Sequence, residues 1–303
     1  MARRFADLET KLEVFKENFA KQEAANSSFK KDERMFVPKI DETTKSATVI
    51  LRFIPDPDGI PFVKYIEHSF DYFKGTEKKK YWKHCVNTFG FERGCPLCKK
   101  VSEYYKSAFP EDKKLGGERG RKVRYVSNVY VEKNTNDPTT VGKVFIYKFG
   151  KKIYEKLNKH TNPKDIDFED PDFKTFNPHN IYGGARFVLN VKPQGDYPNY
   201  DDSKFSAPSV FLFKQGDTEE QTDDKIGEVL EKTYKLSEFI DPKLFPTNEE
   251  LIAEIGFLIG FGSAPEPKKE QSNMMGESQS DVPFFDEPTP SSHDEDDDFF
   301  NNI

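Results

Sequence analysis

The chain has 303 residues, of which 35% are hydrophobic and 33% are charged, and its formal net charge is −7. No apolar run approaches the roughly 20 residues that a membrane-spanning helix needs, so no membrane partner is expected. Residues 1–5 lack the apolar segment of a secretion signal, which predicts a soluble intracellular protein. The three cysteines are odd in number and unevenly spaced, so they favour metal binding over a disulfide framework.

Charge is divided unevenly along the chain. Residues 266–303 contain eleven Asp or Glu against two Lys, a net charge of −9. Residues 113–159 contain thirteen Lys or Arg against four acidic residues, a net charge of +9. This asymmetry says more about binding partners than the overall charge does, because each segment attracts ligands of the opposite sign.

Hydrophobic periodicity predicts helices and strands in a mixed order. In chain order we expect a helix over 1–25, a polar linker over 26–45, strands over 47–54 and 62–73, and a turn entering a helix over 95–109. We then expect strands over 122–133, 143–149 and 185–192, a basic helix over 151–159, and helices over 223–240 and 248–260. From residue 263 onward the chain is rich in Pro, Ser, Asp and Glu, which predicts disorder. The pattern favours an α+β body that contains a small barrel.

The sharpest local motif is the C-x-x-C turn formed by Cys95 and Cys98. Cys85 lies ten residues before this turn, and His68 lies seventeen residues before Cys85. Zinc in structural sites prefers four tetrahedral nitrogen or sulfur ligands, and three cysteines with one histidine are a standard set. The sequence therefore predicts one structural zinc ion bound by His68, Cys85, Cys95 and Cys98.

Two alternatives to this ligand set are open. Cys95 and Cys98 can form a redox pair, although no thioredoxin-like strand pattern surrounds them. His84 is a rival fourth ligand because it adjoins Cys85. Neighbouring strand residues point to opposite faces, however, and this favours His68.

Two segments, residues 121–125 and 144–152, interleave cations with aromatic rings. Non-specific binders of single-stranded DNA need this combination, because cations follow the phosphates while rings stack on unpaired bases. The competing interpretation is that Phe145 and Phe149 are core residues and that the lysines after them only begin a solvated helix. The DNA-binding residues predicted from these segments are Arg121, Lys122, Arg124, Tyr125, Tyr147, Lys148, Lys151 and Lys152.

Four sequence motifs occur together in this chain, and their order along it is informative. They are the His68, Cys85, Cys95 and Cys98 set, residues 49–55 (VILRFIP), residues 143–152 (KVFIYKFGKK), and residues 187–192 (FVLNVK) followed by 199–205 (NYDDSKF). With these stretches the chain resembles, over roughly residues 45–205, the single-stranded DNA-binding, helix-destabilising proteins of T-even-type bacteriophages.

The resemblance implies an oligonucleotide-binding (OB-fold) β-barrel with an inserted zinc-binding subdomain at about residues 62–110, both within a DNA-binding core at 26–262. DNA would lie in the cleft between the barrel and the zinc subdomain. By position, the residues that line this cleft would be Arg52, Arg121, Tyr125, Tyr147, Tyr197 and Tyr200. The implied function is to protect and organise unpaired DNA, without sequence preference, during phage replication, recombination and repair in the cytoplasm of the infected bacterium.

The resemblance also implies roles for the two ends. Residues 1–25, including Arg3 and Arg4, would give cooperative self-association along the DNA strand. Residues 263–303 would recruit replication and recombination proteins, and their acid is expected to compete for the DNA cleft. Paired Phe side chains can dock in an apolar pocket while carboxylates meet its basic rim. The pairs in this tail are Phe284 with Phe285 and Phe299 with Phe300.

Two other classes of function compete with DNA-strand binding. A zinc nuclease or deaminase needs an open metal position and a nearby acid or base, and no H-x-E motif precedes the C-x-x-C turn, so we expect no enzyme. A zinc-ribbon transcription regulator is the second alternative, and it would present a helix to the major groove of duplex DNA. No G-x-x-x-x-G-K-[ST] loop is found, which argues against ATP-driven activity.

Overall fold

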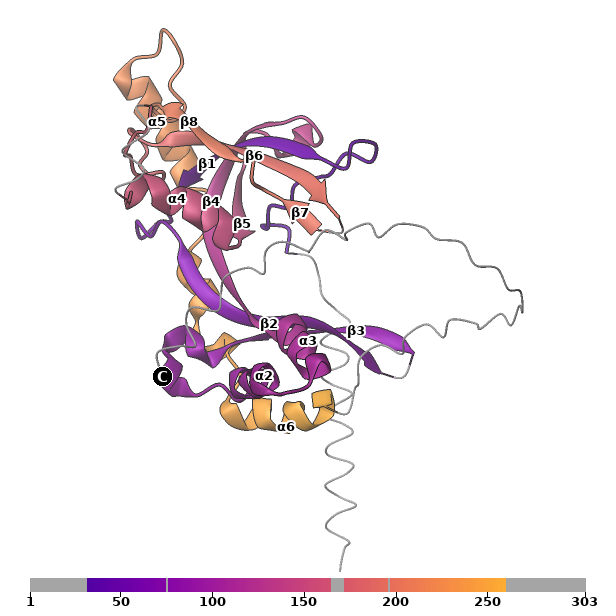
Figure 1. Ribbon diagram of the computed structural model, residues 1–303. Helices are drawn as coiled ribbons and strands as arrows, with labels where there is room; N and C mark the ends of the chain where they lie inside the picture. The colour runs from indigo at the N-terminus through magenta and orange to yellow at the C-terminus, as the bar shows by residue number, and fades with distance from the viewer. Residues whose placement is uncertain (1–31, 75, 165–171, 196, 260–303) are drawn as a thin grey trace, which may run out of the picture. The chain divides into compact units, whose positions relative to one another are not determined.

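Eight strands of the computed structural model form one antiparallel sheet within the described residues, which are 32–74, 76–164, 172–195 and 197–259 (Figure 1). The path β3-β2-β4-β1-β6-β7 is extended by β5, which pairs with β4, and by β8, which pairs with β6. The strands are β1 (Ala47–Ile54), β2 (Val63–Lys74), β3 (Glu77–His84), β4 (Arg121–Asn134), β5 (Val144–Phe149), β6 (Ala185–Gln194), β7 (Tyr197–Asn199) and β8 (Lys204–Pro208).

The long strand β4 connects two parts of this sheet. Its first half, Arg121 to Val126, pairs with β2, and its second half, Asn128 to Asn134, pairs with β1. Strand β5 runs along the other edge of β4, from Tyr125 to Tyr130. Strand β4 therefore shares backbone hydrogen bonds with β2 in one part of the sheet, with β1 in the other, and with β5 along its second edge.

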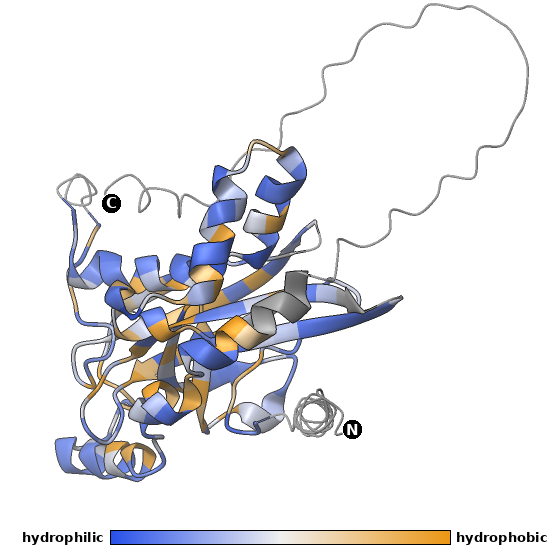
Figure 2. Ribbon diagram, turned by 90° about the horizontal axis from the view of Figure 1, so that it is seen from below, coloured by the Kyte–Doolittle hydropathy of each residue, from blue (hydrophilic) through white to orange (hydrophobic). Residues whose placement is uncertain are grey.

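One large apolar cluster, called here the sheet core, lies around β1, β4, β5 and β6. These strands are rich in β-branched and aromatic residues, which suit a pleated and buried surface. Phe53 and Phe187 have no exposed surface, and their ring centroids lie 5.5 Å apart. Figure 2 shows hydrophobic residues, in orange, along the inner strands and the inner turns of helices. The buried members are Phe36, Ala47, Val49, Leu51, Phe53, Tyr125, Val129, Val131, Tyr147, Phe149, Ile153, Leu157, Phe187, Leu189 and Val191.

A second and smaller cluster, the metal-side core, lies under β2 and β3. Helix α2 (Pro96–Lys106) packs against both α3 (Pro110–Arg119) and α6 (Asn248–Ile259), and α3 also contacts β2 (Figure 1). The buried members of the metal-side core are Ile66, Phe70, Tyr81, Cys85, Cys95, Leu97 and Leu251.

The remaining helices are α4 (Lys151–Thr161) and α5 (Glu219–Leu230). Thr218 begins α5 with a capping box, in which its hydroxyl accepts from the Gln221 backbone and the Gln221 side chain accepts from the Thr218 backbone. The two 3-10 turns that follow, η5 (Leu236–Ile240) and η6 (Pro242–Leu244), lead to α6. The expected helix over 223–240 is therefore wrong at both ends, because the cap starts it earlier and a turn stops it at Leu230.

The five expected strands and three of the expected helices (95–109, 151–159 and 248–260) agree with the structure, and several elements were missed. Strand β3 follows β2 as its hairpin partner, and α3 follows α2. Strands β7 and β8 pair with β6. The expected linker over 26–45 is wrong in its described part, since Phe36 is buried and Met35 bridges to Ile146 beside β5. The expected helix at 1–25 and the tail from 263 lie outside the described residues, as do the residues assigned to them.

No helix within the described ranges combines the length and apolar character needed to cross a membrane.

Candidate metal centre and nucleic-acid interface

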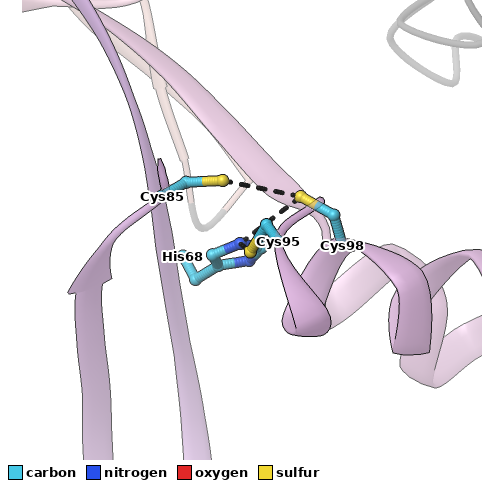
Figure 3. A group of neighbouring side chains, drawn as sticks. All are labelled: His68, Cys85, Cys95 and Cys98. Atoms are coloured by element: carbon cyan, nitrogen blue, oxygen red, sulfur yellow. Dashed lines mark hydrogen bonds between the residues drawn. The ribbon is translucent and has the colours of Figure 1, made fainter. Parts of the chain in front are cut away.

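His68, Cys85, Cys95 and Cys98 point toward one another, as the close-up in Figure 3 shows. Their ligand atoms all lie within 4.8 Å of one another. The sulfurs of Cys85 and Cys98 are 3.5 Å apart, and His68 Nε2 lies 3.5 Å from the sulfur of Cys95. Ligands at the usual bond lengths on a tetrahedral zinc are separated by about 3.5 to 3.8 Å. The spacing therefore fits four ligands around one metal ion.

The local sequence builds this cluster from two strands and one helix start. His68 lies within β2, and Cys85 follows β3 directly, with its backbone N–H donating to the carbonyl of Ile66. Cys95 is the N-cap of α2, whose first residue is proline, a residue that suits a helix start. The buried amide of Asn87 accepts a 2.9 Å hydrogen bond from the Cys95 backbone and fixes the turn.

The electrostatics of the three thiols favour a bound cation. Hydrogen bonds from Cys85 and Cys98 lower the pKa of Cys95, whereas the contact with Cys95 raises the pKa of Cys85. One thiolate thus makes a second one harder to form, because like charges repel at this distance. A divalent ion removes this conflict, since it stabilises all the thiolates that it binds. The residues present therefore fit a metal, and His68 and the three cysteines would hold it.

His84 is not part of the cluster. It pairs with Glu67 across the hairpin and lies on the opposite face of β2 and β3 from His68. Its ring packs against Trp82 at 4.6 Å and Phe245 at 4.7 Å, and burial lowers its pKa to about 4. The structure thus places His68, and not His84, beside the three cysteines, as the strand-parity argument expects.

A group of cations lies on the face of β4 and β5 away from the metal ligands. Lys122 pairs with Glu67, Arg124 pairs with Tyr65, and Lys148 pairs with Val126, so all three share one face. Arg121 instead lies beside His68 on the metal face, with its guanidinium 4.9 Å from the ring of Phe91. The structure therefore separates Arg121 from the other cations of its segment.

Glu67 is the acidic partner within this cation group. Its carboxylate is 2% exposed, and it accepts from Arg124 Nε at 2.8 Å and from Lys148 Nζ at 2.7 Å. Burial alone would raise the pKa of Glu67, but the charge of Lys148 and the hydrogen bonds of both cations outweigh burial and lower it. Burial also lowers the pKa of Lys148. We take the pair as ionised, because each group has an opposite charge in direct contact.

The predicted tyrosines lie on the other face of the β4–β5 ribbon and are buried. Tyr125 is 6% exposed, and its ring stacks on that of Tyr154 at 4.1 Å with an interplanar angle of 5°. Tyr147 is 4% exposed and stacks on Phe149. Tyr154 and Tyr200 are half-buried and pack against the same core. Neither Tyr125 nor Tyr147 is accessible to a DNA base in this structure. Direct stacking of bases on Tyr125 or Tyr147 stays a prediction, and it requires that these rings become exposed.

The lysines that begin α4 are exposed, as expected for a solvated helix start. Lys152 forms an ion pair with Asp201 at 3.3 Å, and Lys156 donates to the Asp201 carbonyl at 2.8 Å. Tyr200 therefore lies next to a residue that is tied to the basic helix. Tyr197 contributes its backbone to β7, whose pairing with β6 precedes this turn.

Arg52 is placed in the interior, where its side chain supports two loops. It is 1% exposed, and its Nη2 donates to the carbonyls of Ser209 at 2.7 Å and Ile181 at 3.3 Å. Burial lowers its pKa to about 10, which leaves it cationic at neutral pH. The buried guanidinium has no open side for a phosphate in this arrangement.

Sequence reasoning missed Glu67, Trp82 and Tyr154. Glu67 was hidden because a lone charge within a strand is usually a surface residue. Trp82 is the one tryptophan of the chain, and its Nε1 donates to Glu67 at 2.8 Å. Tyr154 was overlooked within the basic helix, although its spacing from Ile153 and Leu157 places it beside the buried face.

Comparison with known proteins gives consistent matches. The family model described as "gp32 DNA binding protein like" matches residues 45–259. A "Single-stranded DNA-binding protein" of Enterobacteria phage T2 is 31% identical over 224 residues, which cover 73% of this chain and 68% of that protein. The protein of the same name from Enterobacteria phage T4 is 31% identical over 224 residues, which cover 73% of this chain and 69% of that protein. The chain therefore belongs to the gp32-like family of DNA-binding proteins.

Proposed function

We propose that this protein binds single-stranded DNA without strong sequence preference. The observation that carries the proposal is membership of a DNA-binding family whose matched relatives are named for single-stranded DNA. The cations of β4, β5 and α4 support it, because a basic surface is the electrostatic footprint of nucleic-acid binding. Neither the names of the relatives nor the family model favours a duplex-binding regulator or an enzyme.

Two groups of cations would hold the phosphates. One is the sheet group of Lys122, Arg124 and Lys148, and the other begins α4 with Lys151 and Lys152. Arg121, on the metal face, would contact DNA only where the strand passes the metal region. Each phosphate contact contributes affinity without reading sequence, because the backbone is the same at every base.

Base stacking would fall first to the aromatic rings that keep some exposure. Tyr154 and Tyr200 are half-buried, and the buried Tyr125 and Tyr147 rings would support them from behind. Stacking on an aromatic ring is worth about 1–3 kcal/mol per base and tolerates any sequence. Tyr197 would join this group through the β7 turn. Arg52 would act indirectly by holding the loops around Ile181 and Ser209.

We propose that the bound metal is one structural zinc ion. Three thiolates with one imidazole suit zinc, and four protein ligands leave no open position for a substrate. When bound, the ion would supply cross-linking between β2, the end of β3 and the start of α2. The chain's own residues then hold β2 in place, and β2 carries the cation-binding Glu67 beside His68.

We propose that the strands around the sheet core close into an OB-fold barrel within a DNA-binding core of residues 26–262, with the zinc-binding subdomain at about 62–110. The antiparallel pairs β1–β4, β4–β5 and β1–β6 supply most of such a barrel, and Met35 covers the outer edge of β5. Solution scattering of the DNA-bound protein, together with strand-pair contacts from NMR, would test closure. An open edge on β5 would contradict it.

We propose separate roles for the ends of the chain. Residues 1–25, with Arg3 and Arg4, would mediate cooperative binding of neighbouring copies, so deleting residues 1–20 should reduce cooperativity more than single-site affinity. Residues 263–303 would bind replication and recombination proteins through the Phe284–Phe285 and Phe299–Phe300 pairs. The same tail would compete with DNA, and equal affinity with and without residues 266–303 at low salt would refute that competition.

The cellular role that follows is protection and organisation of unpaired DNA during phage replication, recombination and repair in the cytoplasm of an infected bacterium. A competition titration tests the underlying activity. Full-length protein is titrated onto fluorescently labelled oligo-dT and challenged with unlabelled oligo-dT or with duplex of equal length. We expect the single strand to compete at far lower concentration. Equal or better competition by duplex would reject the proposal in favour of the zinc-ribbon regulator.

A further inference from the structure

We propose that Glu67 is a positioning residue for DNA phosphates, whose buried carboxylate holds Arg124 and Lys148 side by side as one preorganised cation pair. The inference rests on the proposed single-stranded DNA binding and deepens it. It assigns a role to an acidic residue inside a basic surface, where charge alone would argue against having one. Glu67 acts through the two cations and does not itself touch DNA.

The contacts of Glu67 tie four strands together. The residue lies on β2, and its three donors come from β3, β4 and β5. Trp82 of β3 donates at 2.8 Å, Arg124 of β4 at 2.8 Å and Lys148 of β5 at 2.7 Å. Because the carboxylate is only 2% exposed, it cannot swing out into solvent to release these partners. The geometry of the pair is therefore fixed by the sheet.

Both cations keep capacity for a further anion. Their side chains are 29% and 30% exposed, whereas the carboxylate beneath them is covered. Arginine has five N–H donors, and Glu67 uses only Nε of Arg124. Lysine has three donors, and Glu67 uses one of those of Lys148. The donors that remain can serve a phosphate oxygen from the solvent side.

Because Glu67 orders the two cations in advance, we expect it to raise the affinity for DNA although its own charge repels phosphate. Two long cationic side chains lose rotamer freedom when they grip a phosphate, and they repel each other when they are brought together. Glu67 removes both costs before DNA arrives, since it has already ordered the pair and neutralised one of its charges. Arg124, Lys148 and Glu67 together still carry one net positive charge. Lys122, which lies opposite Glu67 on β4, adds another. Attraction for the phosphate chain is therefore kept.

The main test is the variant Glu67→Gln, which adds one positive charge to the surface but releases the pair. We expect the affinity for oligo-dT to fall about tenfold, from the ordering of two side chains. The matched control is Glu132→Gln on β4, which also removes one negative charge from an ion pair, with Arg186. The control should bind as tightly as the wild type, or slightly more tightly. Equal or tighter binding by Glu67→Gln would overturn the proposal.

A double-mutant cycle distinguishes positioning from a general structural role. Arg124→Gln should weaken binding in the wild-type background, and it should weaken binding less in the Glu67→Gln background, where Arg124 is already released. Non-additivity of this kind is the signature of side chains that act together. Additive losses would contradict the proposal, because they would mean that Glu67 affects DNA binding without acting through Arg124.

Trp82 gives a readout in the wild-type protein, should Glu67→Gln fail to fold. It is the one tryptophan of the chain, it donates to Glu67, and Lys148 Nζ lies 6.0 Å from its ring centroid. Saturation with oligo-dT should change its emission when excited at a wavelength selective for tryptophan. Binding of a labelled oligo-dT with unchanged Trp82 emission would overturn the positioning proposal alone. Failure of wild-type protein to bind any oligo-dT would instead reject the proposed function, and this inference with it.

Discussion

The sheet core and the metal-side core are built from the same sheet but stabilised in different ways. Within the described residues, the sheet core buries fifteen side chains, including Phe53 and Phe187, which are fully covered. The metal-side core buries seven, and two of these are the metal-ligand candidates Cys85 and Cys95. Small apolar cores need an additional cross-link such as a structural metal. One part of the sheet is thus stabilised by a large buried core, whereas the other has a small core beside a cluster of four residues that could hold a metal ion.

Removal of the metal should produce the largest difference in stability between the two cores. Structural zinc contributes on the order of 10 kcal/mol to folding, so verified removal of the metal should unfold the metal-side core. Amide hydrogen exchange should show loss of protection in β3 and α2, while β1 and β6 keep theirs. Unchanged melting and exchange after complete metal removal would contradict the comparison. The variant Cys95→Ser should reproduce the effect of metal removal.

Phe53→Ala should be the converse experiment on the sheet core. Truncating a fully buried phenylalanine costs about 3–5 kcal/mol, because transfer energy is lost and a cavity remains. Denaturant titration measures this loss in the free energy of unfolding. The loss should be the same in the metal-bound protein as in protein from which the metal has been removed. The comparison breaks if Phe53→Ala lowers metal affinity as strongly as Cys95→Ser does.

Acid should weaken the sheet core through His179. This residue is 7% exposed, packs against Phe53 at 5.5 Å, and has its pKa lowered from 6.5 to about 4 by burial. The folded state resists protonation of His179. The contribution of this residue to the free energy of unfolding is therefore complete above pH 6.5 and is lost as pH falls from 6.5 through 4. The loss amounts to about 3 kcal/mol at most.

The variant His179→Gln isolates this contribution from that of His84, whose pKa is also lowered to about 4 by burial. The free energy of unfolding of wild type and variant should be compared by denaturant titration between pH 7 and pH 4. The difference between them should change across this window. A difference that is constant with pH would show that His179 does not titrate as described.

Thr218→Ala should give the smallest effect and serves as a reference outside both cores. Loss of an N-cap hydroxyl costs about 1 kcal/mol, because the Gln221 backbone N–H loses its acceptor. The melting temperature should fall by a few degrees, and neither metal affinity nor DNA affinity should change. Replacement by serine should restore the wild-type value. A loss of metal affinity would show that α5 is coupled to the metal-side core.

Much of the sheet could be predicted from local pattern. The alternation in 47–54 and 122–133 and the apolar run in 143–149 reflect strands that pack on the sheet core. Strand β3 was missed because its Lys78, Lys79 and Lys80 give no apolar alternation, and it forms only as the hairpin partner of β2. Helix α3 was missed because Gly116 and Gly117 lower helix propensity, although Gly116 lets α3 approach Tyr105 closely.

The candidate site, like the sheet, could be predicted from the sequence only in part. The cluster of His68, Cys85, Cys95 and Cys98 could be found because C-x-x-C spacing and strand parity are local properties of the chain. Strand parity also predicts that Arg121 and Lys122 point to opposite sides of β4, but which side faces the cysteine cluster depends on the pairing of β4 with β2. Glu67 and the burial of Arg52 depend on long-range contacts, with Lys148 and with the loop at Ser209. Such contacts leave no mark in the local pattern.

The central claim is that cations of this protein hold the phosphates of a single strand. The direct test is a titration of full-length protein onto oligo-dT at several salt concentrations. The logarithm of the affinity should fall linearly with the logarithm of salt, with a slope of about −0.7 for each phosphate neutralised. An affinity that does not vary with salt would contradict the account. So would the absence of binding at low ionic strength after removal of residues 266–303.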